Sequence, residues 1–451
     1  MLRPGQTLGR PVVLRQETRG EPLQGFRTFH ALLLAATLPF MILYLPLFSA
    51  AGAGVLTVHD IALGAVSCTT LILLLSRRDL VLRGSASTRL CLIAIMPAFL
   101  CIFSSINYDP HSPLLRDFLV CIKRFGGPSV LTIAASLSTE KDKSLLAKAA
   151  VVALLLAALL PLTPIAQYLP TPPDINTGRH HEEIRNSGVI FNPNEFAAVA
   201  VLVLAIALGG IAGRRAGVWK VAAIGATAYV IVSSGSRGAM AAFFAGAVFL
   251  IVKAKTSAMA RVAIFAVIAL MIGMGLQLSE SFKARMGSAV ARESADESFT
   301  TRLDMQWIGI TTGIHNPLGV GIVNAETATS RYSRASIFGL VGATGATDSI
   351  YVDYFLETGF AGLSCILLTF WLAWRLVSTK GSGSQGVYLQ AGVLAAAVMG
   401  FSALSPAAVS VAPFFFLLVG LHPIGHADRQ LREVMARRQV LRARAIRRVA
   451  S

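Results

Sequence analysis

The stretch SSGSRGAM, residues 233–240, interrupts a run of apolar residues that is long enough to cross a membrane. Serines, glycines and Arg237 stand where a lipid-facing helix would continue. A charged side chain at the centre of a bilayer costs about 2.5–3.5 kcal/mol on insertion scales. The chain must therefore gain something from Arg237, and the surrounding sequence indicates what that is.

The composition of the 451-residue chain is that of an integral membrane protein. Hydrophobic residues make up 54% of the chain and charged residues only 14%, and the mean hydropathy is +0.65. A soluble protein would carry about 25% charged residues. The net charge of +17 does not indicate a nucleic-acid partner, because most of the charges stand in short segments between apolar runs.

Runs of about 20 apolar residues predict an all-α membrane fold with about twelve transmembrane helices. We expect one polytopic domain over 1–451, with both termini in the cytoplasm, because this orientation puts most of the lysines and arginines inside. The basic segment 425–451 is then a cytoplasmic tail. The expected helices lie near 31–51, 58–76, 90–106, 114–137, 146–168, 196–213, 217–233, 238–254, 262–278, 350–375, 386–403 and 407–424.

Two segments on the expected outer side, 169–195 and 279–349, are too long to be simple turns. Within the second, residues 298–314 predict an amphipathic helix that lies on the membrane surface. Arg302 stands at the edge of its apolar stripe, where it could face a cavity at the level of the lipid headgroups. The stripe consists of Phe299, Leu303, Trp307, Ile310 and Ile314.

Three expected spans enter the membrane from the outer side, so their N-termini should share one face. A helix N-terminus has unpaired N–H groups and a partial positive charge, which favour anions. The span near 196–213 begins with Asn192 as its cap and Pro193 at the first helical position. The span near 238–254 begins with Ser236 as its cap and Arg237 in the first turn.

The third of these starts, TDSIY, offers Thr347 or Asp348 as its cap. Asp348 could therefore be only a helix cap rather than a residue that takes part in a reaction. Likewise, Arg185 could be an ordinary loop residue paired with a nearby glutamate, and Arg237 could extend to the outer headgroups from a simple turn. These alternatives remain open from the residues alone.

The position of Arg237 favours a bound anion. A cation in the first turn is at the wrong end of the helix dipole, so Arg237 and the free N–H groups repel each other unless an anion lies between them. With Arg185, seven residues before Asn192, a second guanidinium is available on the same side. Two arginines can bind a diphosphate in bidentate fashion. A diphosphate linked to a lipid fits a site at the outer membrane face.

Four motifs in order resemble the bacterial O-antigen ligase and polymerase family. They are R-x-x-G followed by NPNEFA from Arg185, SRGA from Ser236, RLDMQWIG with NPLGVGIVN from Arg302, and TDSIYVDYFLETGFAGL from Thr347. The matching segments extend over roughly 185–363. The resemblance implies a GT-C-like membrane glycosyltransferase at the periplasmic face of the bacterial inner membrane. It would take a glycan from undecaprenyl diphosphate without a metal or cofactor.

The same resemblance implies roles for individual residues. Arg185 and Arg237 would bind the diphosphate and act in catalysis, and Arg302 would assist. We add the polar groups at the helix starts to this diphosphate site: Asn192, Asn194 and Ser236. Ligases of the family usually carry a histidine as base where TDSIY stands here, so Asp348 occupies that place and would be the catalytic base. We expect no metal ligands and no cofactor.

The departure at Asp348 favours a polysaccharide polymerase, which would transfer the lipid-linked glycan to a hydroxyl of a lipid-linked repeat unit. The nearest alternative is an O-antigen ligase that transfers the glycan to lipid A–core. The alternative from another class is a flippase of lipid-linked oligosaccharide, but the polar interruptions cluster after residue 180 rather than in matched halves. Membrane lipid, a chain-length regulator and a separate flippase are the expected partners, and nucleic acid is not.

Overall fold

The fold is known from a computed structural model. The described residues are 22–42, 46–50, 54–76, 85–163, 192–212, 216–253, 269, 273, 297–333, 336, 347, 349–378, 383–401 and 411–422. The predictions for Arg185, Asp348, the span near 262–278, most of the loop 169–195 and the tail 425–451 lie outside these residues.

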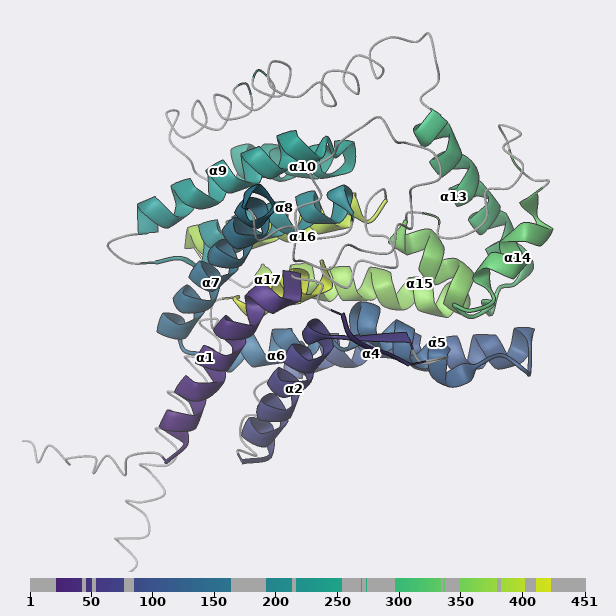
Figure 1. Cartoon of the computed structure of the whole chain (residues 1–451), viewed down its shortest axis with the longest axis horizontal. Coiled ribbons are helices and arrows are strands. Elements are labelled where there is room, and N and C mark those ends of the chain that lie inside the picture. Colours follow the sequence, from purple (N-terminus) through teal and green to yellow (C-terminus); the bar gives the residue numbers. More distant parts are fainter. Residues whose placement is uncertain are drawn as a thin grey trace, which may run out of the picture.

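The described part is almost entirely helical, as expected (Figure 1). The helices before the first undescribed loop are α1 (Pro22–Ile42), α2 (Val58–Ser76), α4 (Ser85–Tyr108), α5 (Leu114–Cys121), a π-helical turn (Ile122–Gly126), α6 (Val130–Ser136), α7 (Glu140–Leu159) and a 3-10 turn (Leu160–Leu162). Those after it are α8 (Pro193–Gly210), α9 (Ala216–Ser234), α10 (Arg237–Lys253), α13 (Glu297–His315), α14 (Ala325–Arg331), α15 (Ile350–Val377), α16 (Gly383–Met399) and α17 (Ala412–Gly420).

Eight of the described helical segments are long and apolar enough to cross a membrane. The chain is thus a multispan membrane protein by length and composition. The expected spans near 238–254 and 386–403 correspond to α10 and α16, which have 17 residues each. The span expected near 407–424 contains the nine-residue α17.

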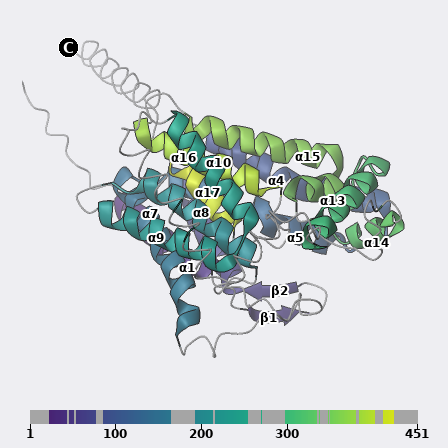
Figure 2. The same cartoon turned by 90° about the horizontal axis from the view of Figure 1, so that it is seen from above.

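A short antiparallel hairpin lies between α1 and α2, where the sequence predicted continuous helix up to residue 51. Its strands are β1 (Pro46–Ala50) and β2 (Gly54–Thr57). Figure 2 shows the hairpin at one edge of the molecule. The first span therefore ends at Ile42. An apolar strand and an apolar helix end have the same composition, and only the glycines and proline around the hairpin distinguish them.

Three of the four charged residues in the fourth span, Leu114–Ser136, have a partner inside the molecule, and the fourth, Arg116, is exposed. Asp117 accepts a hydrogen bond from the Val323 backbone N–H at 2.8 Å. Lys123 pairs with Asp60 at 3.0 Å, and Arg124 pairs with Glu357 at 2.6 Å. Because of these charges, this segment was the least certain of the spans predicted from the sequence. Their pairing explains how such charges can be buried in an apolar bundle.

Helix α15 is not one continuous span, which corrects the expectation of a straight helix over 350–375. Gly359 has a φ of 67° and a ψ of −163°, which is not helical. The rings of Tyr351 and Phe370 lie 6.0 Å apart, whereas nineteen residues of straight helix would separate them by about 28 Å. Residues 350–358, here called the half-helix, therefore fold back along residues 360–377.

The segment expected at the outer side forms one end of the molecule. In both views α13 and α14 lie together at the end opposite α9 and the start of α7 (Figures 1 and 2). The turn at Gly359 is held to this end, because the Phe360 N–H donates to the Pro317 carbonyl at 3.2 Å and the Val320 N–H donates to the Leu356 carbonyl at 3.0 Å.

The predicted amphipathic helix within the segment is confirmed as α13. Its large apolar residues Leu303, Trp307 and Ile314 are exposed, at 37%, 46% and 60%. Its buried face includes Asp304, Ile308 and Thr312, and Gly309 and Gly313 on this face pack on the half-helix. An exposed apolar stripe of this kind suits contact with membrane lipid.

Candidate functional site

The starts of α8 and α10 lie at the same end of the bundle, because both helices run antiparallel to α16. A Cβ on Gly392 would meet Ala205, and one on Gly209 would meet Leu389, so rising numbers in α8 match falling numbers in α16. Gly246 of α10 lies beside Ala391. Arg237 is nine residues before Gly246. Because α10 and α16 are antiparallel, Arg237 lies at about the level of the residue nine positions after Ala391, which is Gly400.

The half-helix begins at this same level. The Ile350 N–H donates to the Gly400 carbonyl at 3.0 Å. The Tyr351 hydroxyl donates to the Ala397 carbonyl at 2.8 Å. Residues 400–401, which directly follow α16, thus meet the first turn of the half-helix, and α10 begins at about their level. We call this place the α16 junction.

The stretch SSGSRGAM, residues 233–240, contains the turn between α9 and α10. Gly235 has a φ of 60°, a left-handed conformation that a side chain would disfavour. Ser236 is 1% exposed and its hydroxyl accepts from the Ala239 N–H at 3.4 Å, so the predicted cap is present. Arg237 is the first residue of α10 and is half-buried. The polar turn is therefore inside the molecule rather than on its surface.

The start of α8 also matches the prediction. Asn192 is the cap, and its side chain accepts from the Asn194 N–H at 2.9 Å, with Pro193 at the first helical position. Glu195 is 4% exposed. Asn192 and Asn194 are half-buried at the end of the helix, where the helix dipole favours an anion.

The start of the half-helix differs from the prediction. Its cap residue is Ser349, not Thr347 or Asp348. Thr347 instead donates twice to the Asp353 carboxylate, from its backbone N–H at 2.9 Å and from its hydroxyl at 2.8 Å. The segment before the helix is thereby tied to the first turn, a bond that local cap rules do not predict.

Helix α13 brings Arg302 toward the same junction. A Cβ on Gly309 would meet Thr347 and Val352, so the middle of α13 packs at the start of the half-helix. One turn earlier, the Gln306 amide donates to the Phe401 carbonyl at 3.0 Å. Arg302 precedes Gln306 by four residues and therefore lies on the same face of α13. This face meets the end of α16.

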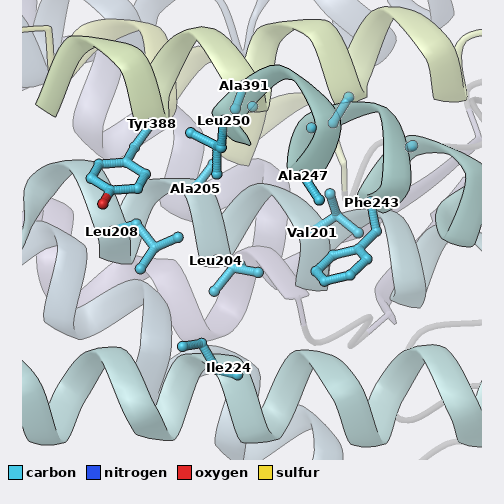
Figure 3. Close-up of a pocket in the computed structure, with 14 residues that line it drawn as sticks. Val201, Leu204, Ala205, Leu208, Ile224, Phe243, Ala247, Leu250, Tyr388 and Ala391 are labelled. Atoms are coloured by element: carbon cyan, nitrogen blue, oxygen red, sulfur yellow. The ribbon is translucent and has the colours of Figure 1, made fainter. Parts of the chain in front are cut away.

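An apolar pocket of about 180 Å³ lies between α8, α9, α10 and α16. Figure 3 shows Leu208, Leu250 and Tyr388 at one end of it and Val201 and Phe243 at the other. The second end is the one toward the starts of α8 and α10. The pocket thus lies deeper in the bundle than Arg237 and Asn192, and its lining consists almost wholly of carbon.

The predicted site residues that the structure describes come from three helices, of which α8 and α10 begin at the same end of the bundle. Arg237 and Ser236 begin α10, Asn192 and Asn194 begin α8, and Arg302 lies on the face of α13 that meets α16. Arg185 and Asp348 are outside the described residues. Among the described residues, no group of three or more histidines, cysteines and carboxylates is placed to hold a metal ion.

Sequence reasoning did not single out Arg124, Glu357 and Asp353 as site residues. Arg124 and Glu357 form an ion pair at 2.6 Å with side chains 15% and 5% exposed, and Asp353 is 3% exposed. The available signal was a charge inside an apolar span, which is a reason to expect function. The pairing across 233 residues of sequence carried no local signal.

Comparison with known families confirms the resemblance. Residues 222–367 match the family described as O-antigen ligase. The match runs from α9 to the second half of α15 and includes Ser236, Arg237 and Arg302. The search of curated proteins found no match.

Proposed function

We propose that this chain, whose residues 222–367 match the O-antigen ligase family, is a polysaccharide polymerase that works without a metal. The donor is a glycan on undecaprenyl diphosphate, and the acceptor is a hydroxyl of a lipid-linked repeat unit. The reaction takes place at the periplasmic face of the bacterial inner membrane. A chain-length regulator and a flippase are the proposed protein partners.

The observation that carries this proposal is that α8 and α10 begin at the same end of the bundle, and that the half-helix also begins there. Arg237 stands at the start of α10. Helix N-termini and guanidinium groups both stabilise a diphosphate. Arg237 binds it together with Arg302 and Arg185, while Asn192, Asn194 and Ser236 supply polar contacts.

The apolar pocket suits the lipid part of the same donor. One of its ends lies toward the starts of α8 and α10, and it is lined by side chains such as Leu204, Leu250 and Ala391. The diphosphate at the helix starts and the first isoprene units in the pocket would then belong to one molecule. A free sugar nucleotide has no hydrocarbon chain for this pocket, which favours a lipid-linked donor.

The transfer itself needs a base and a stabilised leaving group. The acceptor oxygen attacks the anomeric carbon, the bond from that carbon to the phosphate oxygen breaks, and undecaprenyl diphosphate leaves. Asp348 accepts the acceptor's proton. Arg237 and the helix N-termini stabilise the negative charge that develops on the diphosphate.

A ligase that transfers the glycan to lipid A–core is the second candidate, and the description of the matching family favours it. Both enzymes use the same donor and differ only in the acceptor. Asp348, in place of the histidine that ligases of the family usually carry, leads us to prefer the polymerase.

The deciding experiment is gel analysis of surface glycans in a deletion strain complemented with the wild type, Arg237→Ala or Lys253→Ala. Lys253 is the matched control, because it is a cation at the opposite end of the same helix. We expect single-repeat glycans from Arg237→Ala and the wild-type ladder from Lys253→Ala. Full-length glycan retained on the lipid carrier would instead identify a ligase.

A wild-type ladder from Arg237→Ala, with equal protein in the membrane, would contradict the proposal. The flippase alternative is separated by reconstitution in vesicles. A flippase moves labelled lipid-linked oligosaccharide across the bilayer without changing the length of its glycan, whereas a polymerase lengthens it.

A further inference from the structure

A buried group of charges joins the half-helix to the span Leu114–Ser136. The Arg124 Nη1 donates to the Glu357 Oε1 at 2.6 Å. Asp353 lies four residues before Glu357, on the same face of the half-helix. The side chain of Glu357 is 5% exposed and Asp353 is 3% exposed. The proposed function above uses none of these residues.

The group is only partly satisfied by hydrogen bonds. Within the described part of the chain, the Arg124 Nε, Asp353 Oδ2, Glu357 Oε2 and Tyr354 hydroxyl are buried without a partner. A buried ion pair in this condition is a poor source of stability, and apolar side chains of the same volume often replace such a pair without loss. Unpaired buried polar groups in a native structure call for another explanation.

The position of the half-helix provides that explanation. Nine residues of helix are about 13 Å long, too short to cross a bilayer, so the depth of the half-helix must be set by its neighbours. Its outer end is held at Gly359 and its inner end at Gly400. The Arg124–Glu357 pair is an ionic contact on its side. Arg124 stands in a π-helical turn, and such turns are frequent at functional sites.

Asp353 holds the segment in front of the half-helix. One of its oxygens accepts both the backbone N–H and the hydroxyl of Thr347. Its own N–H donates to the Ser349 carbonyl at 2.8 Å. Both neighbours of residue 348 in the sequence are thus bonded to Asp353, at the α16 junction.

We propose that Arg124, Glu357 and Asp353 are positioning residues of the glycosyl-transfer site. The Arg124–Glu357 pair fixes the depth of the half-helix, and Asp353 fixes the Thr347–Ser349 segment at its tip. This inference rests on the proposed function, since it assigns the half-helix to the acceptor side of that reaction. Donor binding at the starts of α8 and α10 is separate from it.

The ion pair is tested with the single variants Arg124→Met and Glu357→Met and with the double variant, each as the full chain in membranes. We expect each single variant to lower glycan lengthening at least tenfold and to lower the yield of folded protein. The double variant recovers the yield and the thermal stability, because neither member of the pair is left buried without the other, but not the activity. Recovery of full activity in the double variant would show that the pair is only structural.

Asp353 is tested by comparing Asp353→Ala with Asp353→Asn. The asparagine keeps a carbonyl oxygen for the two bonds from Thr347, whereas alanine removes both bonds. We expect Asp353→Ala to lose activity at least tenfold and Asp353→Asn to rescue most of it. An asparagine variant as inactive as the alanine variant would overturn the positioning role, because the charge itself would then be required.

Binding of undecaprenyl diphosphate to the detergent-solubilised chain separates this inference from the proposed function. We expect the Arg124 and Asp353 variants to bind it as tightly as the wild type and to lose kcat rather than raise the donor KM. Loss of binding at least tenfold in these variants would overturn the inference. If Arg237→Ala alone has no effect on glycans, the proposed function fails instead.

Discussion

Gly319 and Gly359 lie back to back, each in the space that a side chain on the other would need. Their φ angles are 84° and 67°. A Cβ on Gly319 would come within 2.6 Å of the Gly359 nitrogen, and a Cβ on Gly359 within 2.9 Å of the Gly319 nitrogen. This contact allows α15 to reverse at the end of the molecule formed by α13 and α14, so the half-helix depends on both glycines.

Gly359→Ala should lower the free energy of unfolding by about 1–3 kcal/mol, the typical cost of a strained backbone position. The methyl group would also collide with the Pro317 carbonyl. Thermal unfolding of the purified chain in detergent measures the effect. The control is Gly225→Ala in the middle of α9, where a Cβ meets nothing within 4 Å, and it should be neutral or stabilising by about 0.5–1 kcal/mol. Equal unfolding midpoints for the two variants would contradict the close contact.

Asp117→Asn should destabilise the outer end by about 1–3 kcal/mol, because buried donors lose a charged acceptor. Asp117 is fully buried and accepts from the Ser105 hydroxyl, the Ser112 hydroxyl and the Val323 N–H. Protease sensitivity of the 297–333 segment measures the effect. Asp109→Asn is the control, since Asp109 makes an exposed bond to the His111 N–H; protection unchanged in both variants would argue against this role for Asp117.

Filling the apolar pocket should weaken the binding of a long-chain donor. Ala247→Leu adds three carbons to the lining, so we expect a several-fold higher KM for an undecaprenyl donor, with kcat unchanged. A donor with two isoprene units should be affected less. Ala241→Leu is the control, because Ala241 is exposed on the same helix. An equal increase in KM for both donors would exclude the pocket as the site of the distal hydrocarbon chain.

Arg237→Lys should retain only part of the activity. Lysine keeps the charge but cannot bind a diphosphate with two parallel hydrogen bonds, so we expect activity between those of the wild type and Arg237→Ala. EDTA should not change the activity of the wild type, Arg237→Lys or Arg237→Ala, because arginines rather than a metal stabilise the leaving group in the proposed reaction. Steady-state rates with and without the chelator provide the measurement, and a lysine variant as active as the wild type would argue against bidentate binding.

The sequence predicted best where local chemistry decides the structure. Asn192 before Pro193 gave the start of α8, and Ser236 after Gly235 gave the start of α10, because caps and left-handed glycines act on their own neighbours. The order of the spans predicted that both helices start at the same end of the bundle. The structure supports it through the packing of both helices on α16.

The sequence predicted least where a distant contact decides the structure. The segment 350–377 is mostly apolar, and neither of its glycines, Gly359 and Gly362, indicates a reversal by itself. The partner that stabilises the reversal at Gly359, Gly319, is 40 residues earlier. The sequence also did not indicate that Arg124 pairs with Glu357, which is 233 residues away. It offered Thr347 as a helix cap, whereas in the structure Thr347 donates to Asp353.

The fold-back at Gly359 also affects how the sidedness of the chain is counted. A half-helix that is too short to cross the bilayer adds no crossing, so α15 contributes one crossing through residues 360–377. Reporter fusions before Ile350 and just after Gly359 should therefore face the same compartment, and a fusion after Val377 should face the opposite one.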